Sequence, residues 1–303
     1  MAFNVQTFKT RTLTAIVFVA VMGLGLFINH WSFLVLFSIV HFGAWREYQR
    51  LIEKIYHPYA ERTPIHKYGI MVTGWAFMLW MCSNAYSIGS YNLHILGWTL
   101  FLVLILVLPI AEVLFTKNLN LRNTRYSLIG FVYISLMLGL LMNLRSGLDA
   151  SDHNIFIDSG SDTETGLKLS LCLIFSLWVN DTMAYIVGSL IGRTPLSAIS
   201  PKKTWEGTAG GILLCVAVIG FLFHKVLYPS IAPWIEGWTW YAVAGIASIA
   251  GTLGDLFESY LKRRAGVKDS GQLMPGHGGF LDRFDSLLLA IPFVVMFLLI
   301  VFE

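Results

Sequence analysis

Long apolar runs are the feature that most constrains how this chain can fold. A helix needs ~20 apolar residues to cross a bilayer. The chain is 56% hydrophobic and 13% charged, whereas an ordinary soluble domain is about a quarter charged. The sequence therefore predicts an all-α, polytopic integral membrane protein with about nine transmembrane helices. The nine runs lie roughly at 12–29, 31–45, 68–88, 93–115, 126–144, 168–191, 208–228, 237–257 and 283–302.

The basic residues predict the orientation of these helices. If the N-terminus is cytoplasmic, 18 of the 21 Lys and Arg residues fall in cytoplasmic segments, and only Arg145, Lys168 and Lys225 fall outside. Such a bias is typical of cytoplasmic loops, so we expect a cytoplasmic N-terminus and an extracytoplasmic C-terminus. The first run is too long for a signal peptide and lacks a small-residue cleavage site, so we expect a retained span.

Two regions are expected along the chain. Residues 1–165 would form helices 1–5, and residues 166–303 a catalytic membrane domain with cytoplasmic loops at 192–207 and 259–282. The net charge of +3 reflects the excess of basic residues in the cytoplasmic segments, which face an anionic leaflet. No nucleic-acid partner is therefore expected. Three cysteines lie unpaired in apolar runs, which favours packing roles. They are Cys82, Cys172 and Cys215.

The segment 259–285 concentrates charge between two apolar runs. Its glycines around His277 would let backbone amides approach an anion. Carboxylates suit hard cations such as Mg²⁺, and basic side chains suit phosphate oxygens. The pattern predicts a metal and phosphate site at a membrane surface. The acids here and just upstream are Asp255, Glu258, Asp269, Asp282 and Asp285, and the bases are Lys262, Arg263, Arg264, Lys268 and Arg283.

A second polar group lies between residues 180 and 207. Asp181, beside Asn180, interrupts an apolar run, and a carboxylate at membrane depth normally has a partner or lines a wet cavity. A structural hydrogen bond is the alternative; we favour the wall of a polar cavity.

The loop that follows Asp181 reads SPKKTWEG. Ser200-Pro201 is expected to begin a helix. Lys202, Lys203 and Thr204 would then donate hydrogen bonds to a phosphate near the positive end of that helix. Glu206 would complement the lysines or help a metal. A basic loop that only sets the orientation is the alternative.

A third element is the helix that precedes the glycine-rich segment. Asp255 and Glu258 are three residues apart and share a helical face, and Ser259 and Lys262 follow at helical spacing from Asp255. Interfacial charges that reach toward water would give the same pattern. The acid and base on one stripe favour a surface that faces the substrate.

These segments resemble the phosphatidate cytidylyltransferases, also called CDP-diacylglycerol synthases. The resemblance covers roughly residues 170–290 and includes the upstream run D-T-M-A-Y…G-R…S-P-K-K-T-W-E-G. It implies that CTP and phosphatidic acid react to give CDP-diacylglycerol and pyrophosphate at the bilayer, with Mg²⁺ and a second cation, in an enzyme that forms a homodimer. The matching positions are Ser259, Lys262, Arg263, Lys268, Asp269, Pro275, His277, Gly278, Gly279, Asp282, Arg283 and Asp285.

The resemblance also implies roles for single residues. Asp255 and Asp282 would hold the metal ions, and Asp285 would be a further ligand or would orient one. Lys262 and Arg263 join these acids in the catalytic group and would bind the CTP triphosphate or the lipid phosphate. Asp181 and Glu206 would line the substrate site. The CTP triphosphate or the lipid phosphate would contact Ser200, Lys202, Lys203, Thr204, Ser259, Lys268, His277, Gly278, Gly279 and Arg283.

Three other readings stay open. An ion-coupled transporter could use Asp181, Asp255 and Glu258, although no repeated halves are evident. A related enzyme could act on another lipid, as a CDP-archaeol synthase or a polyprenol kinase does. An inactive paralogue would keep the same motif. The many spans fit a bacterial inner (cytoplasmic) membrane or an organelle membrane.

Overall fold

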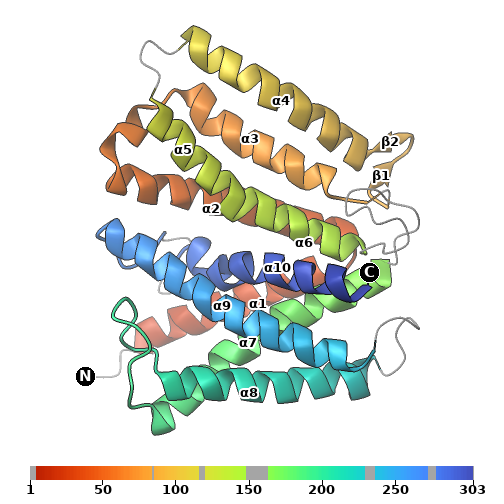
Figure 1. The fold of residues 1–303 in the computed structure, drawn as a ribbon, viewed down its shortest axis with the longest axis vertical. Helices are drawn as coiled ribbons and strands as arrows, with labels where there is room; N and C mark the ends of the chain where they lie inside the picture. The colour runs from red at the N-terminus through yellow and green to blue at the C-terminus, as the bar shows by residue number, and fades with distance from the viewer. Residues whose placement is uncertain are drawn as a thin grey trace. The chain divides into compact units, whose positions relative to one another are not determined.

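The computed structural model describes residues 5–83, 85–115, 120–147, 163–228, 236–271 and 278–302. The fold is helical apart from one short hairpin (Figure 1). The chain forms two compact units. Unit 1 comprises Met1–Gly139 and Leu261–Phe284, and unit 2 comprises Leu140–Tyr260 and Asp285–Glu303. These units are defined by packing. They do not test the expected functional division between residues 1–165 and the catalytic region 166–303, which stays a prediction.

Unit 1 is built around a long helix, α2, whose apolar face is fully buried. Phe33, Phe37 and Ala44 have no exposed surface. Asn29 begins α2 with a capping box, because its side chain accepts the Ser32 amide while the Ser32 hydroxyl receives the Asn29 amide. The elements that lie in this unit or begin in it are α1 (Val5–Phe27), α2 (His30–Ile55), the 3₁₀ helix η1 (His57–Glu61), α3 (Pro64–Trp80), β1 (Ser87–Ile88), β2 (Tyr91–Asn92), α4 (Leu93–Phe115), α5 (Leu121–Gly130), the π-helix η2 (Phe131–Leu136) and α6 (Met137–Ser146).

Unit 2 depends on small residues that let its helices approach closely. α7 and α8 pack side by side (Figure 1). A Cβ atom on Gly211 would lie 2.7 Å from the Cβ of Ala184, and one on Gly207 would lie 2.8 Å from the Cα of Gly188. The helices of this unit are α7 (Thr163–Ile191), α8 (Trp205–Phe221), the π-helix η3 (Leu222–Leu227), most of α9 (Trp238–Arg264) and most of α10 (Leu281–Phe302), while the first turn of α10 and the last turn of α9 belong to unit 1.

Within the described ranges, six helical stretches are long and apolar enough to cross a membrane, judged by length and composition. This pattern is that of a multi-pass membrane protein. The other three predicted runs also meet helices, but α3 has 17 residues and α1 contributes only Thr12–Phe27 as an apolar stretch. The six stretches are Leu93–Phe115, Leu121–Ser146, Glu164–Ile191, Trp205–Leu227, Trp238–Arg264 and Leu281–Val301.

One predicted run extends too far. The run at 68–88 was expected to be a single helix, but α3 ends at Trp80 and the chain turns into the β1–β2 hairpin. Gly89 lies in this turn at φ +62°, a conformation that glycine adopts without the usual steric cost. Apolar composition alone does not register such a turn.

Candidate functional site

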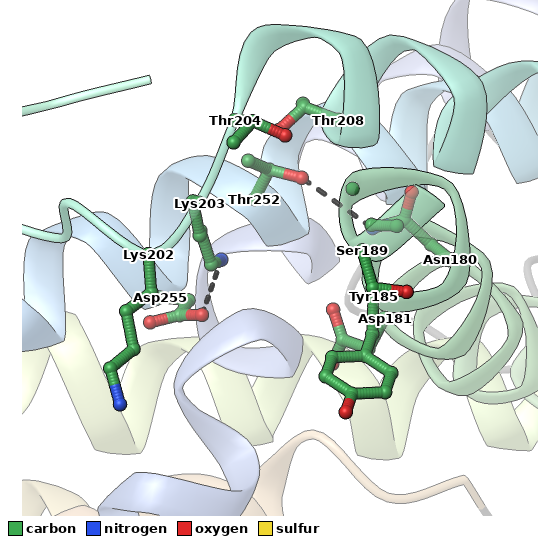
Figure 2. Close-up of a pocket in the computed structure, with 12 residues that line it drawn as sticks. Asn180, Asp181, Tyr185, Ser189, Lys202, Lys203, Thr204, Thr208, Thr252 and Asp255 are labelled. Carbon is green, nitrogen blue, oxygen red and sulfur yellow. Dashed lines mark hydrogen bonds and ion pairs between the residues drawn. The ribbon is translucent and has the colours of Figure 1, made fainter. Parts of the chain in front are cut away.

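A cavity of about 480 Å³ in unit 2 brings together several of the predicted residues. Its walls come from α7, the loop after α7, the start of α8, and α9 (Figure 2). Lys202, Lys203 and Asp255 lie on one side, and Asp181 and Tyr185 on the other. Carboxylates, ammonium groups and hydroxyls thus line one hollow, as the cavity interpretation of Asp181 predicts.

The α7 wall combines a buried amide with exposed groups. Asn180 is 2% exposed, and its Nδ2 lies 3.5 Å from the Thr252 hydroxyl of α9. Asp181 is exposed and lines the cavity beside Tyr185, whose side chain is 78% exposed. The amide therefore ties α7 to α9, while the next residue along the chain presents a carboxylate to the cavity.

The basic loop is folded back on itself, which corrects one expectation. Ser200-Pro201 does not begin a helix: α8 begins at Trp205, and Thr204 is its N-cap. The Thr204 hydroxyl accepts the Gly207 amide at 3.1 Å, an arrangement that satisfies an otherwise unpaired helix-end donor. The Leu196 amide bonds to the Lys203 carbonyl at 2.7 Å. The backbone thus closes a hairpin-like loop.

Lys203 forms an ion pair with Asp255. The Ser259 hydroxyl also donates to Asp255 Oδ1 at 3.3 Å, one helical turn along α9. Lys202, in contrast, is exposed and lines the cavity. Both adjacent lysines therefore line the cavity, Lys203 paired with a carboxylate and Lys202 more exposed.

Glu206 supports the loop through hydrogen bonds. Its carboxylate accepts the Arg193 amide at 3.1 Å, the Thr194 amide at 3.1 Å and the Thr194 hydroxyl at 2.9 Å. We expected Glu206 to complement the lysines or help a metal. The bonds described here join it to the other strand of the loop instead.

A second polar cluster lies in unit 1 around Asp282, in the first turn of α10. Lys262 Nζ lies 2.6 Å from Asp282 Oδ1. The other oxygen, Oδ2, accepts the Ser270 amide at 2.9 Å, the Ser270 hydroxyl at 2.8 Å and the Gly279 amide at 2.8 Å. Both oxygens of Asp282 are therefore engaged. Gly278, at φ +84°, makes the turn that brings these donors to it.

Sequence reasoning missed Glu47, which completes this second cluster. Glu47 lies on α2, is 5% exposed, and accepts the Ser270 hydroxyl at 2.8 Å and the amides of Phe280 and Leu281 at 2.9 Å each. A signal was present, because Glu47 follows Val40 and Ala44 at helical spacing on the buried stripe. An acid on such a stripe is a candidate for a specific partner.

The remaining predicted residues fall into different environments. Asp285 and Glu258 are buried, and the Ser286 amide lies 2.6 Å from Asp285 Oδ1. Ser200 is half-buried. Pro275 and His277 lie outside the described residues. Exposed positions are occupied by Arg263, Arg264, Lys268, Asp269 and Arg283.

The cavity has the donors that a magnesium ion uses. Among the described residues, no three His, Cys, Asp or Glu side chains gather to hold a metal. Mg²⁺, however, is usually bound by one or two carboxylates together with waters and substrate phosphates. Asp181 of α7 and Asp255 of α9 are two such carboxylates on one cavity, which the Thr252 side chain of α9 also lines. The cavity therefore offers carboxylate oxygens suited to the ion, from Asp255 on one side and Asp181 on the other.

The known proteins that this chain resembles belong to one family. A sequence model described as the cytidylyltransferase family matches residues 9–301. A phosphatidate cytidylyltransferase of Haemophilus influenzae is 30% identical over 299 residues, which cover 95% of this chain and 98% of that protein.

Two further relatives match over shorter segments. A phosphatidate cytidylyltransferase of Synechocystis is 43% identical over 143 residues, 45% of each chain. Phosphatidate cytidylyltransferase 4, chloroplastic, of Arabidopsis thaliana is 37% identical over 169 residues, 53% of this chain and 42% of that protein. The chain thus spans less than half the length of these two relatives and nearly all of the Haemophilus protein.

Two glycines with positive φ angles allow a matched test of the Asp282 turn. A Cβ on Gly278 would lie 2.6 Å from Asp282 Oδ2, whereas one on Gly266, at φ +67°, would meet nothing within 4 Å. Each change to alanine costs about 1–2 kcal/mol for the left-handed backbone. We expect Gly278→Ala to lower the thermal unfolding midpoint in detergent further than Gly266→Ala, because it also displaces Asp282. Equal midpoints would contradict this account of the turn.

Proposed function

The chain belongs to the cytidylyltransferase family, and we propose that it condenses CTP with phosphatidic acid to give CDP-diacylglycerol and pyrophosphate in phospholipid biosynthesis. The observation that carries this proposal is the cavity of unit 2, where two lysines and two carboxylates meet. Both reactants are anionic, so their encounter requires cationic groups and fixed positions. The similarity to phosphatidate cytidylyltransferases over nearly the whole chain supports the choice of lipid.

In the proposed reaction, a phosphate oxygen of phosphatidic acid attacks the α-phosphorus of CTP. A new P–O bond forms, and the bond between the α-phosphorus and the oxygen that bridges it to the β-phosphorus breaks, which releases pyrophosphate. No general base is needed, because the attacking phosphate is already ionised near neutral pH. The protein's task is to bind, orient and neutralise.

The cavity residues supply these functions. Lys202 is exposed and lines the cavity, and it would contact the triphosphate as a point charge. The Thr208 hydroxyl and the exposed ring of Tyr185 offer further contacts to a nucleotide. Glu206 keeps the loop folded through its bonds to residues 193 and 194. The lysine is thereby presented on a fixed loop, not on a free chain.

We also propose a divalent cation as cofactor, held by Asp255 with Asp181. Such an ion stabilises the charge of the attacking and leaving oxygens in displacements at phosphorus. Lys203 now neutralises Asp255 and would exchange with the ion. The expectation that Asp282 and Asp285 bind metal stays a proposal, and Asp282 would first have to release donors such as Lys262. The second cation and the homodimer also remain proposals.

Removing the carboxylate of Asp255 tests the cation proposal. We expect purified protein to convert CTP and phosphatidic acid to CDP-diacylglycerol with Mg²⁺ and to lose this activity in EDTA. Asp255→Asn should reduce turnover at least about 100-fold. The control is Glu236→Gln, which neutralises an acid that instead accepts the Trp238 indole N–H. Turnover that survives both EDTA and Asp255→Asn would refute the role of the ion. Product formed only with another lipid phosphate would refute phosphatidic acid as the acceptor.

Removing the charge of Lys202 tests nucleotide binding in the cavity. We expect Lys202→Gln to raise the KM for CTP about tenfold, since a charge-assisted hydrogen bond contributes about 1.5 kcal/mol, with little change in the KM for phosphatidic acid. Lys225→Gln is the matched control, because Lys225 is an exposed lysine in η3. An equal change in both variants would show that only overall charge matters.

We further propose nine spans with a cytoplasmic N-terminus, in the cell's inner (cytoplasmic) membrane. The apolar side chains of α1 support this count, because Leu13, Ile16 and Val17 are 51–64% exposed and would be covered by lipid. An odd number of spans places the two termini on opposite sides, and an even number returns the chain to the same side. Alkaline phosphatase fused to the C-terminus should therefore be active, and fluorescent protein fused to the N-terminus should fluoresce. An inactive C-terminal phosphatase would refute nine spans.

A further inference from the structure

Glu47 is a buried carboxylate whose described bonds all come from one segment. It accepts the Ser270 hydroxyl and the Phe280 and Leu281 amides. These donors lie more than 220 residues away in the sequence and carry no formal charge. A carboxylate taken out of water is costly unless hydrogen bonds replace the lost solvent. The same bonds therefore fix the position of Glu47 and the position of the segment that donates them.

The bond pattern requires a carboxylate rather than an amide. Oε1 accepts the Phe280 amide, while Oε2 accepts the Leu281 amide and the Ser270 hydroxyl. A glutamine has a single acceptor oxygen, and its NH₂ group would face a donor. The negative charge also lies at the positive end of α10, where the first amides lack partners within the helix.

The surrounding glycines show that the segment is fitted to this side chain. A Cβ on Gly271 or Gly279 would collide with the Glu47 carboxylate. Along α2, a Cβ on Gly43 would collide with the ring of Phe280. Backbone from the glycine-rich segment therefore lies directly against α2, at positions where side chains would separate the two.

The same donors connect Glu47 to Asp282. The Gly279 amide bonds to Asp282, and the next two amides, of Phe280 and Leu281, bond to Glu47. Ser270 Oγ lies 2.8 Å from Glu47 Oε2 and 2.8 Å from Asp282 Oδ2. The one Ser270 hydroxyl proton thus lies between two carboxylates that divide three consecutive amides, so moving Glu47 would move the donors that orient Asp282.

We propose that Glu47 is a positioning residue that holds the turn at 278–281 and Ser270, and through them orients Asp282 and its partner Lys262 for the transfer reaction. The proposal rests on the proposed function, because it assumes that the Lys262–Asp282 pair serves that reaction. Glu47 itself touches neither substrate in this role; it acts through the segment that it binds.

The test compares Glu47→Gln with Glu53→Gln. Glu53 lies on the same helix, and its carboxylate pairs with Arg62 at 3.0 Å. We expect Glu47→Gln to lower kcat roughly 10- to 100-fold, as loss of an orienting partner does at other sites, with the KM for CTP unchanged within about twofold, because Glu47 is not among the residues that line the proposed nucleotide cavity. Glu53→Gln should leave both constants as in the wild type. Glu47→Asp, which keeps two acceptor oxygens, should retain more activity than Glu47→Gln.

Hydrogen exchange supplies a readout that is independent of activity. In Glu47→Gln, amides in the peptide 278–284 should exchange faster, while those of α8 should not change. Wild-type kcat and exchange in this variant would overturn the proposal. Faster exchange throughout the protein would also overturn it, because Glu47 would then serve only general stability. If the wild type lacks the transfer activity, the proposed function fails, yet the exchange at 278–284 still decides whether Glu47 holds this turn.

Discussion

A carboxylate that leaves water has to receive hydrogen-bond donors or a cation, and both polar clusters are organised by that requirement. In unit 1, Glu47 and Asp282 divide the amides at the start of α10 and share Ser270. In unit 2, Lys203 neutralises Asp255 at the edge of the cavity. The glycines of the unit 1 segment follow from the same need, because a Cβ on Gly271 or Gly279 would collide with the Glu47 carboxylate.

Local patterns predicted much of the architecture and part of the site. The run at 93–115 has the same bounds as α4, since a long apolar stretch favours a helix even though Gly97 and Pro109 lie within it. Asp181 was also found locally, because a carboxylate within an apolar run is costly, and Asp255 because acids and a base share one stripe of its helix; both line the cavity. In these cases the physical cause acts within a few residues of the side chain concerned.

The features that sequence reasoning missed depend on distant or fine contacts. The partners of Glu47 lie more than 220 residues along the chain, so only the folded structure shows that its charge is compensated. The start of α8 was misplaced because Ser200-Pro201 is a plausible helix start, whereas the cross-loop bond from Leu196 to Lys203 and the Thr204 cap favour a later one. The β1–β2 turn depends similarly on Gly89, a single residue in an otherwise apolar stretch.

The pairing of Lys203 with Asp255 gives the cavity two charge states. In the ion pair the ammonium neutralises the carboxylate, and both residues line the cavity. A divalent ion that replaced the ammonium at Asp255 would add two positive charges to the cavity and leave the lysine free beside Lys202. The attraction of the cavity for a polyanion would then depend on which cation occupies Asp255. The charges of the protein would therefore favour binding of the metal before the nucleotide.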